Sequence, residues 1–219
     1  MSSNNPNNIK DKVILVTGAL GQIGTEISTS FLIQGAKVIL TDINMNKKNT
    51  LIQKFNNEGI DKNNYLFLLL DILNEDNCKK VIQKSVNKFD RIDVLINNAA
   101  IDAKFDNENN SKINNSRFEN YPLDLLKNSV DVNLTGTIII TQVVCRQMLK
   151  QKHGNIINVA STYSVVSPNQ SLYNFEEEKI NYKPIDYIAS KSFIPNFTRY
   201  IATFYAKEGI RCNAIVPHG

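Results

Sequence analysis

VILVTGALGQIG, residues 13–24, is the stretch of sequence that decides the fold. Its apolar start, Val13–Val16, is typical of a buried strand, and helical spacing of apolar residues follows over Gln22–Gln34. The three glycines between and within these elements allow a tight turn and a close approach of the backbone to a ligand. The N–H groups that open the helix would then face a pyrophosphate. An ordinary strand-to-helix turn, with glycines for packing, is the alternative interpretation.

Apolar runs and amphipathic stretches alternate from this turn to the end of the chain. The expected strands are Val13–Val16, Lys37–Leu40, Tyr65–Leu70, Val94–Ile96, Asn155–Val159 and Arg211–Val216. The expected helices are Gln22–Gln34, Asn46–Glu58, Glu75–Phe89, Leu123–Lys150 and Ile185–Glu208. This alternation predicts an α/β fold, a doubly wound (Rossmann) parallel sheet in a three-layer αβα arrangement. Two long polar connections, Asp102–Asn120 and Pro168–Lys183, interrupt it.

The bulk composition is that of one globular domain, with 219 residues, 42% of them hydrophobic and 21% charged. We expect a disordered tail over residues 1–10, without the apolar run of a secretory signal, and a single catalytic domain over residues 11–219. The net charge is +4, and the basic residues form no continuous stripe, which argues against nucleic-acid binding. No apolar stretch is long enough for a membrane span. Three widely spaced cysteines indicate buried thiols, no metal site and a cytoplasmic location.

Acidic residues end two of the expected strands. Asp42 lies 18 residues past Gly24, where a carboxylate would accept hydrogen bonds from both hydroxyls of a ribose and repel a 2′-phosphate. This position favours NAD over NADP. A turn or helix-capping aspartate is the alternative, and the two roles are compatible. Asp71, at the end of the third expected strand, is a weaker candidate beside the adenine.

Tyr187 and Lys191 are four residues apart at the start of an expected helix, so their side chains share one face. A phenol, with a reference pKa of about 10, is a poor proton carrier at neutral pH, and a nearby ammonium favours its ionised form. Such a phenol can take a proton from an alcohol or give one to a carbonyl group. A chance pair on a helix surface is the alternative for these two residues alone.

Taken together, these motifs resemble the short-chain dehydrogenase/reductase family. The matching pieces occur in family order along nearly the whole chain: Thr17–Gly24, Asp71, Asn97-Asn98-Ala99-Ala100, Asn133, Ser161, the Tyr187/Lys191 pair and Pro217-His218-Gly219. The resemblance implies an NAD(P)-dependent enzyme that acts on CH–OH groups. It implies that Tyr187 is the general acid/base, and that Lys191 lowers the pKa of Tyr187 and holds the nicotinamide ribose. Ser161 would bond the reacting oxygen, and Asn133 would support a water that relays protons to Lys191. For Asn133 and Ser161 alone, the alternatives are a helix-packing amide and a strand-end turn residue.

The resemblance also implies a set of residues that contact the cofactor and a homodimer or homotetramer built through the two longest helices. The expected cofactor contacts are Thr17, Gly18, Leu20, Gly21, Gln22, Ile23, Gly24, Asp42, Asp71, Ile72, Asn98, Ala99, Ala100, Tyr187, Lys191, Pro217 and Gly219.

The sequence departs from the usual family pattern in four places. The glycine loop is G-x-x-G-x-x-G, which is closer to the sugar-nucleotide branch, and Ala100 stands where glycine is usual. Ser161 and Tyr187 are 26 residues apart, which enlarges the loop between them. Family members generally continue beyond the Pro-His-Gly segment, so we expect a sheet that lacks its last strand and a chain truncated at its C-terminus.

Both long polar connections are expected to line the mouth of the substrate site, and their composition favours a polar, sugar-like substrate. They could also be merely solvated. The segments 161–168 and 193–199 resemble oxidoreductases of the flagellin and surface-glycan modification branch. Two other functions stay open. One is an epimerase or dehydratase that acts on sugar nucleotides and retains its NAD, and the other is a non-catalytic nucleotide-binding protein.

Overall fold

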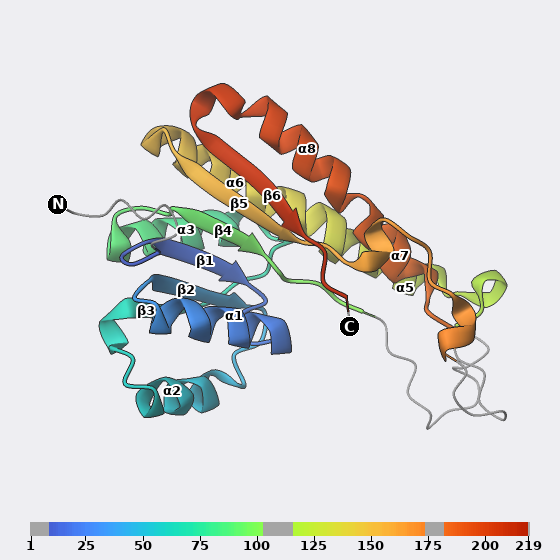
Figure 1. Cartoon of the computed structure of the whole chain (residues 1–219), viewed down its shortest axis with the longest axis horizontal. Coiled ribbons are helices and arrows are strands. Elements are labelled where there is room, and N and C mark those ends of the chain that lie inside the picture. Colours follow the sequence, from blue (N-terminus) through green and yellow to red (C-terminus); the bar gives the residue numbers. More distant parts are fainter. Residues whose placement is uncertain (1–8, 103–115, 174–181, 219) are drawn as a thin grey trace.

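The computed structural model describes residues 9–102, 116–173 and 182–218. Six parallel strands form one sheet in the order β3-β2-β1-β4-β5-β6 (Figure 1). The strands are β1 (Val13–Thr17), β2 (Lys37–Asp42), β3 (Tyr65–Leu69), β4 (Val94–Asn97), β5 (Gly154–Val159) and β6 (Ile210–Ile215). The α-helices are α1 (Gln22–Ile33), α2 (Lys48–Asn57), α3 (Glu75–Phe89), α5 (Leu123–Val130), α6 (Thr137–Gln151), α7 (Ile185–Ser192) and α8 (Ile194–Phe204).

Within the described ranges, six shorter helical segments connect these elements. They are η1 (Lys62–Asn64), η2 (Phe118–Asn120), η3 (Asp131–Gly136), η4 (Thr162–Ser164), η5 (Gln170–Tyr173) and η6 (Ala206–Glu208). The prediction of a doubly wound parallel sheet is confirmed, and each of the six expected strands is present.

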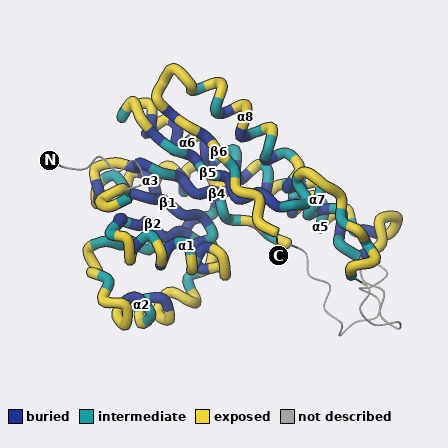
Figure 2. The backbone as a smooth tube through the Cα atoms, in the orientation of Figure 1, coloured by how far each residue is buried: buried dark blue, intermediate teal, exposed yellow. Residues whose placement is uncertain are grey.

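Alternate residues of the strands enter two separate hydrophobic clusters, one on each face of the sheet. Leu15 packs with α3 and α6, whereas Ile14 and Val16 pack with α1 and α2. All five residues of β1 are buried, and the inner strands are the most deeply buried part of the chain (Figure 2). Burial of each large aliphatic side chain contributes roughly 1.5–3 kcal/mol, so this double-sided packing is the main stabilising force of the sheet.

The two longest expected helices are each divided in the structure. A six-residue π-helical segment, η3, separates α5 from α6 within the helix expected over residues 123–150. Its residue Asn133 bonds groups outside the helix, and Gly136 packs so closely on Ile72 that an added Cβ would lie 2.7 Å from the Ile72 Cγ1. The second helix breaks at Phe193, because Pro195 in the first turn of α8 has no N–H to continue the helix.

Some expectations fall on residues outside the described ranges. The N-terminal tail up to residue 8, residues 103–115 and 174–181 of the two long polar connections, and Gly219 are in this group. Within the described ranges, no helix is long and apolar enough to cross a membrane, and no cluster of His, Cys, Asp and Glu side chains could hold a metal ion. Cys78, Cys145 and Cys212 are free and buried, as expected, and burial raises the pKa of each thiol to about 11 or 12.

The strand order reverses at β1, which pairs with β2 on one side and β4 on the other. The connections that follow β1 and β4 therefore leave the sheet in opposite directions and open a crevice at the carboxyl ends of the strands. This is the place where a doubly wound sheet binds its ligand.

Candidate active site

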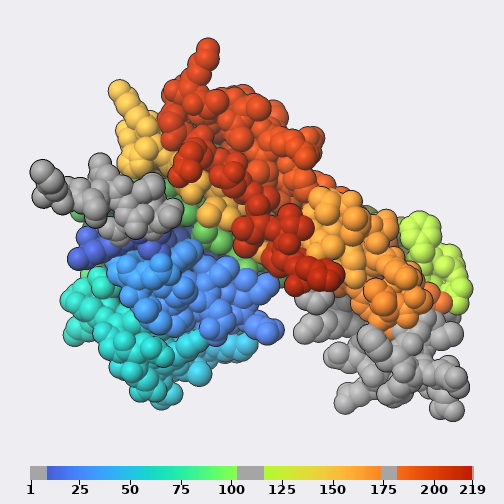
Figure 3. Space-filling view, viewed as in Figure 1, coloured from blue at the N-terminus to red at the C-terminus, as the bar shows by residue number. Residues whose placement is uncertain are grey.

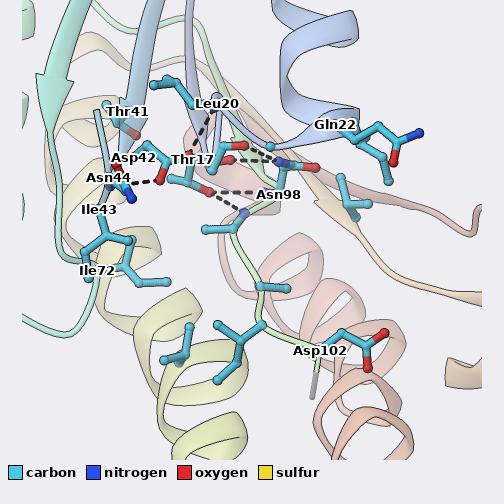
Figure 4. A pocket seen from close by; sticks show the side chains of 18 of the residues that line it. Thr17, Leu20, Gln22, Thr41, Asp42, Ile43, Asn44, Ile72, Asn98 and Asp102 are labelled. Atoms are coloured by element: carbon cyan, nitrogen blue, oxygen red, sulfur yellow. Dashed lines mark hydrogen bonds between the residues drawn. The ribbon is translucent and has the colours of Figure 1, made fainter. Parts of the chain in front are cut away.

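A cavity of about 880 Å³ occupies this crevice, a size within the range of small-molecule sites. It is lined mainly by the turns that follow β1 to β5, several of whose residues are labelled in Figure 4, and by Tyr187 and Lys191 of α7. In the space-filling view, the C-terminal residues lie across the surface between the β1–α1 half and α7 (Figure 3). The expected residues that line it are Thr17, Gly18, Leu20, Gly21, Gln22, Ile23, Asp42, Asp71, Ile72, Asn98, Ala99, Ala100, Ser161, Tyr187, Lys191 and Pro217.

The glycine turn is shaped by close backbone contacts. Gly18 has a φ of +62°, and an added Cβ would lie 2.8 Å from the Cα of Ala99. Gly24 does not line the cavity, because it is buried against the same turn, where a Cβ would lie 2.2 Å from the carbonyl oxygen of Gly18. The N-cap of α1 is Gly21, which offers no side chain to the first N–H groups of the helix. These donors therefore open into the cavity and suit the phosphates of a dinucleotide.

Thr17 and Asn98 join the turn after β1 to the turn after β4 (Figure 4). The Thr17 hydroxyl accepts from the N–H groups of Asn98 and Ala99 at 3.1 and 3.0 Å. The Asn98 side-chain amide donates to the carbonyl oxygens of Thr17 and Gly18, both at 3.0 Å. The two loops on either side of the crevice are thereby fixed relative to each other before any ligand binds.

Asp42 combines the two roles that the sequence left open. Its carboxylate accepts from the N–H of Leu20 at 3.0 Å and from the N–H of Asn44 at 3.1 Å, so it is a turn aspartate. It also lines the cavity, at the end formed by the residues after β2. Asp71 is similar, since it accepts from the N–H of Leu73 at 2.9 Å and lines the same cavity.

Tyr187, Lys191 and Ser161 line the same cavity as Asp42 and the glycine turn. The Lys191 ammonium is buried and donates to the carbonyl oxygen of Val159 at 2.9 Å. Burial lowers the pKa of Lys191 to about 8, partly opposed by the negative charge of Asp102. The Ser161 hydroxyl accepts from the N–H of Tyr163 at 3.2 Å, which leaves its proton available for a donor bond toward the cavity.

Asn133 lies behind these residues and does not line the cavity. Its side chain donates to the Ser190 hydroxyl at 2.9 Å, and it bonds both the N–H and the carbonyl oxygen of Ile101. Its hydrogen bonds therefore connect α7 to the loop that follows β4. Ile101 and Asp102 also line the cavity, and they open the connection that was expected at the substrate mouth. The other lining residues were not expected from the sequence: Thr41, Ile43, Asn44, Asn46, Lys47, Leu70, Leu73, Asn128, Val132, Val159 and Ala160.

Comparisons with known proteins agree with this geometry. A family model of short chain dehydrogenases matches residues 12–175. The chain is 29% identical over 212 residues to a 7alpha-hydroxysteroid dehydrogenase of Bacteroides fragilis, covering 96% of this chain and 72% of the relative. It is 30% identical over 210 residues to an NAD-dependent glycerol dehydrogenase of Listeria innocua, covering 96% and 71%. The structure resembles an NAD⁺-bound xylitol dehydrogenase with a TM-score of 0.79 at 27% identity, covering 95% of this chain and 70% of that one.

Proposed function

The chain belongs to the short-chain dehydrogenase family, and from this premise we propose that Tyr187 is the general acid/base of an NAD(P)-dependent oxidoreductase acting on alcohol and carbonyl groups. The observation that carries this proposal is the single cavity shared by Tyr187, Lys191, Ser161 and the glycine turn. Such a cavity brings a proton carrier and a dinucleotide site to the same space.

The residues of the crevice fit a dinucleotide. The uncapped start of α1 and the close approach of Gly18 to the loop after β4 suit a pyrophosphate, and Asp42 suits the hydroxyls of the adenosine ribose. The nicotinamide, when bound, accepts or gives the hydride. Lys191 would hold its ribose, and Ala99, Ala100 and Pro217 would line its pocket.

The side chains around the reacting oxygen would have separate roles in hydrogen bonding and proton transfer. Ser161 would donate a hydrogen bond to the substrate oxygen, and the Tyr187 phenol would carry the proton to or from that oxygen. The lowered pKa of Lys191, about 8, makes its ammonium a better proton donor near neutral pH than an exposed lysine, which suits a group that passes protons. Asn133 is a positioning residue, because it holds both Ser190 of α7 and the backbone of Ile101.

We further propose NAD as the preferred cofactor, a polyhydroxylated substrate and a homo-oligomer. The Asp42 carboxylate supports the preference for NAD, since it would repel the 2′-phosphate of NADP. The names of the glycerol and xylitol dehydrogenases support a polyhydroxylated substrate, although another relative is named for a hydroxysteroid. The resemblance to the flagellin and surface-glycan branch stays a prediction.

A screen of polyols and their carbonyl partners, with NAD(H) and NADP(H) in parallel, tests this function. We expect formation of NADH from at least one polyol, measured by its absorbance, and slower or no formation of NADPH. The variant Asp42→Ala should narrow this preference by about tenfold or more, the effect of one lost hydrogen bond to a charged group. An unchanged preference would show that Asp42 does not select the cofactor. Absence of hydride transfer with every alcohol and carbonyl compound would contradict the proposed function.

A further inference from the structure

A second lysine lies against the proposed acid/base residue. The ammonium of Lys183 is 3.9 Å from the centre of the Tyr187 ring and donates to the Asp102 Oδ2 at 2.7 Å. Lys183 precedes Tyr187 by four residues and Lys191 follows it by four, so the phenol has a lysine on each side along the chain. The role proposed for Lys191 does not account for Lys183 or Asp102.

The backbone at both ends of this ion pair is anchored. The side-chain amide of Gln170 bonds both backbone groups of Lys183, accepting from its N–H at 2.8 Å and donating to its carbonyl oxygen at 3.2 Å. Asp102 follows Ile101, whose N–H and carbonyl oxygen are both bonded by Asn133. These hydrogen bonds fix the backbone positions from which the two side chains reach each other, so the ion pair has a defined place beside the cavity.

The two members of the pair differ in what they present to the cavity. Asp102 lines the cavity with 37% of its side chain exposed, whereas Lys183 does not line it and is 14% exposed. Asp102 lies at the far end of the close-up from Asp42 and the glycine turn (Figure 4). The negative charge of Asp102 also raises the pKa of Lys191 against the effect of burial, which places the carboxylate within electrostatic reach of that ammonium. A substrate at Tyr187 would thus face the Asp102 carboxylate, with the Lys183 ammonium behind it, outside the cavity lining.

We propose that Asp102 is a specificity-determining residue that accepts a hydrogen bond from a substrate hydroxyl close to the reacting carbon, and that Lys183 holds it in place. An ionised carboxylate only accepts hydrogen bonds, so it selects hydroxyl donors. It repels a carboxylate or phosphate at the same position, and a simple alcohol offers it no second hydroxyl as a donor. The substrate class is a neutral polyol or the corresponding hydroxy ketone. This inference rests on the proposed role of Tyr187.

Three alcohols of equal chain length test the proposal: a straight-chain polyol, the polyhydroxy acid with the same carbon skeleton, and a simple secondary alcohol. The measurement is kcat/KM for each with the preferred cofactor, together with the Kd of that cofactor. We expect the wild type to favour the polyol over both others by about tenfold or more. The variant Asp102→Asn should reduce the ratio of kcat/KM for the polyol to kcat/KM for the polyhydroxy acid by about tenfold or more, without changing the Kd of the cofactor. The variant Asp102→Glu, which keeps a carboxylate, should retain part of this ratio. Lys183→Gln should raise KM for the polyol more than it lowers kcat.

The control is Glu26→Gln, which removes the carboxylate of an ion pair with Lys54 between α1 and α2, outside the cavity lining, and should change none of these ratios. A wild type that favours the acid would overturn the proposal, since it would mean that Lys183 faces the substrate. So would an Asp102→Asn variant that slows all three alcohols by the same factor. In both cases Tyr187→Phe should still abolish turnover, and the proposed function would stand. No turnover of any alcohol by the wild type would overturn both.

Discussion

Replacement of Tyr187 by phenylalanine is expected to lower kcat by about 10²–10⁴-fold, the usual contribution of a general acid/base. The substitution removes one hydroxyl from a half-buried side chain and keeps the ring that packs beneath Lys183. The affinity for NADH, measured by titration, should stay within about twofold, because the proton carrier acts in the transition state and contributes little to ground-state binding. The expected signature is therefore a loss of kcat without a loss of cofactor binding.

The matched control for this variant is Tyr200→Phe. Tyr200 lies on α8 with 59% of its surface exposed, and it does not line the cavity. Its loss of a hydroxyl should leave both kcat and the Kd for NADH unchanged. Retention of more than about a tenth of the wild-type kcat by Tyr187→Phe would show that another group carries the proton.

Replacement of Lys191 by methionine is expected to abolish most turnover and, at the same time, to stabilise the cofactor-free fold at neutral pH. Lys191 is 5% exposed, and its pKa falls from 10.5 to about 8 because burial opposes the charged form. A fall of this size corresponds to about 3 kcal/mol of native-state destabilisation by the charged lysine. Methionine fills similar space without the charge, but it loses the bond to the Val159 carbonyl oxygen, so the net gain should be about 1–3 kcal/mol.

The pH dependence separates this effect from simple repacking. Between pH 8 and 10.5 the unfolded chain binds a proton at Lys191 that the native state has lost, so the free energy of unfolding contributed by this group rises with pH. The advantage of Lys191→Met over the wild type should accordingly shrink as pH rises through this window, as measured by urea denaturation. Lys207→Met, at an exposed lysine, should show no such trend. An advantage that is independent of pH would contradict the account of a buried charge.

The strands of this fold could be predicted because a doubly covered sheet requires continuously apolar segments. Val13–Val16 and Val38–Leu40 meet this requirement without help from the rest of the chain. The interruptions of the long helices were harder to predict. Pro195 gave a local signal for the break after α7, whereas the π-helical segment at Asn133 depends on bonds to Ile101 and Ser190, which are distant in sequence.

The residues of the candidate site also differ in how far the sequence predicts them. Tyr187, Lys191 and the glycine turn are recognisable because their spacing within one helix or one turn is itself the functional geometry. Asp102 and Lys183 are 81 residues apart, and their pairing exists only once β4 and α7 are in place. The sequence offered one hint: Asp102 comes two residues after the Asn-Asn-Ala-Ala segment, and Lys183 comes one helical turn before Tyr187.

The central claim is tested most directly by a crystal structure of the protein grown with NAD⁺. We predict that the pyrophosphate lies against the backbone of residues 18–24 and that the adenosine ribose bonds Asp42. We also predict that the nicotinamide ring lies between Ser161 and Tyr187, with its ribose within hydrogen-bonding distance of the Lys191 ammonium. A dinucleotide bound outside this cavity, or one whose nicotinamide points away from Tyr187, would contradict the account.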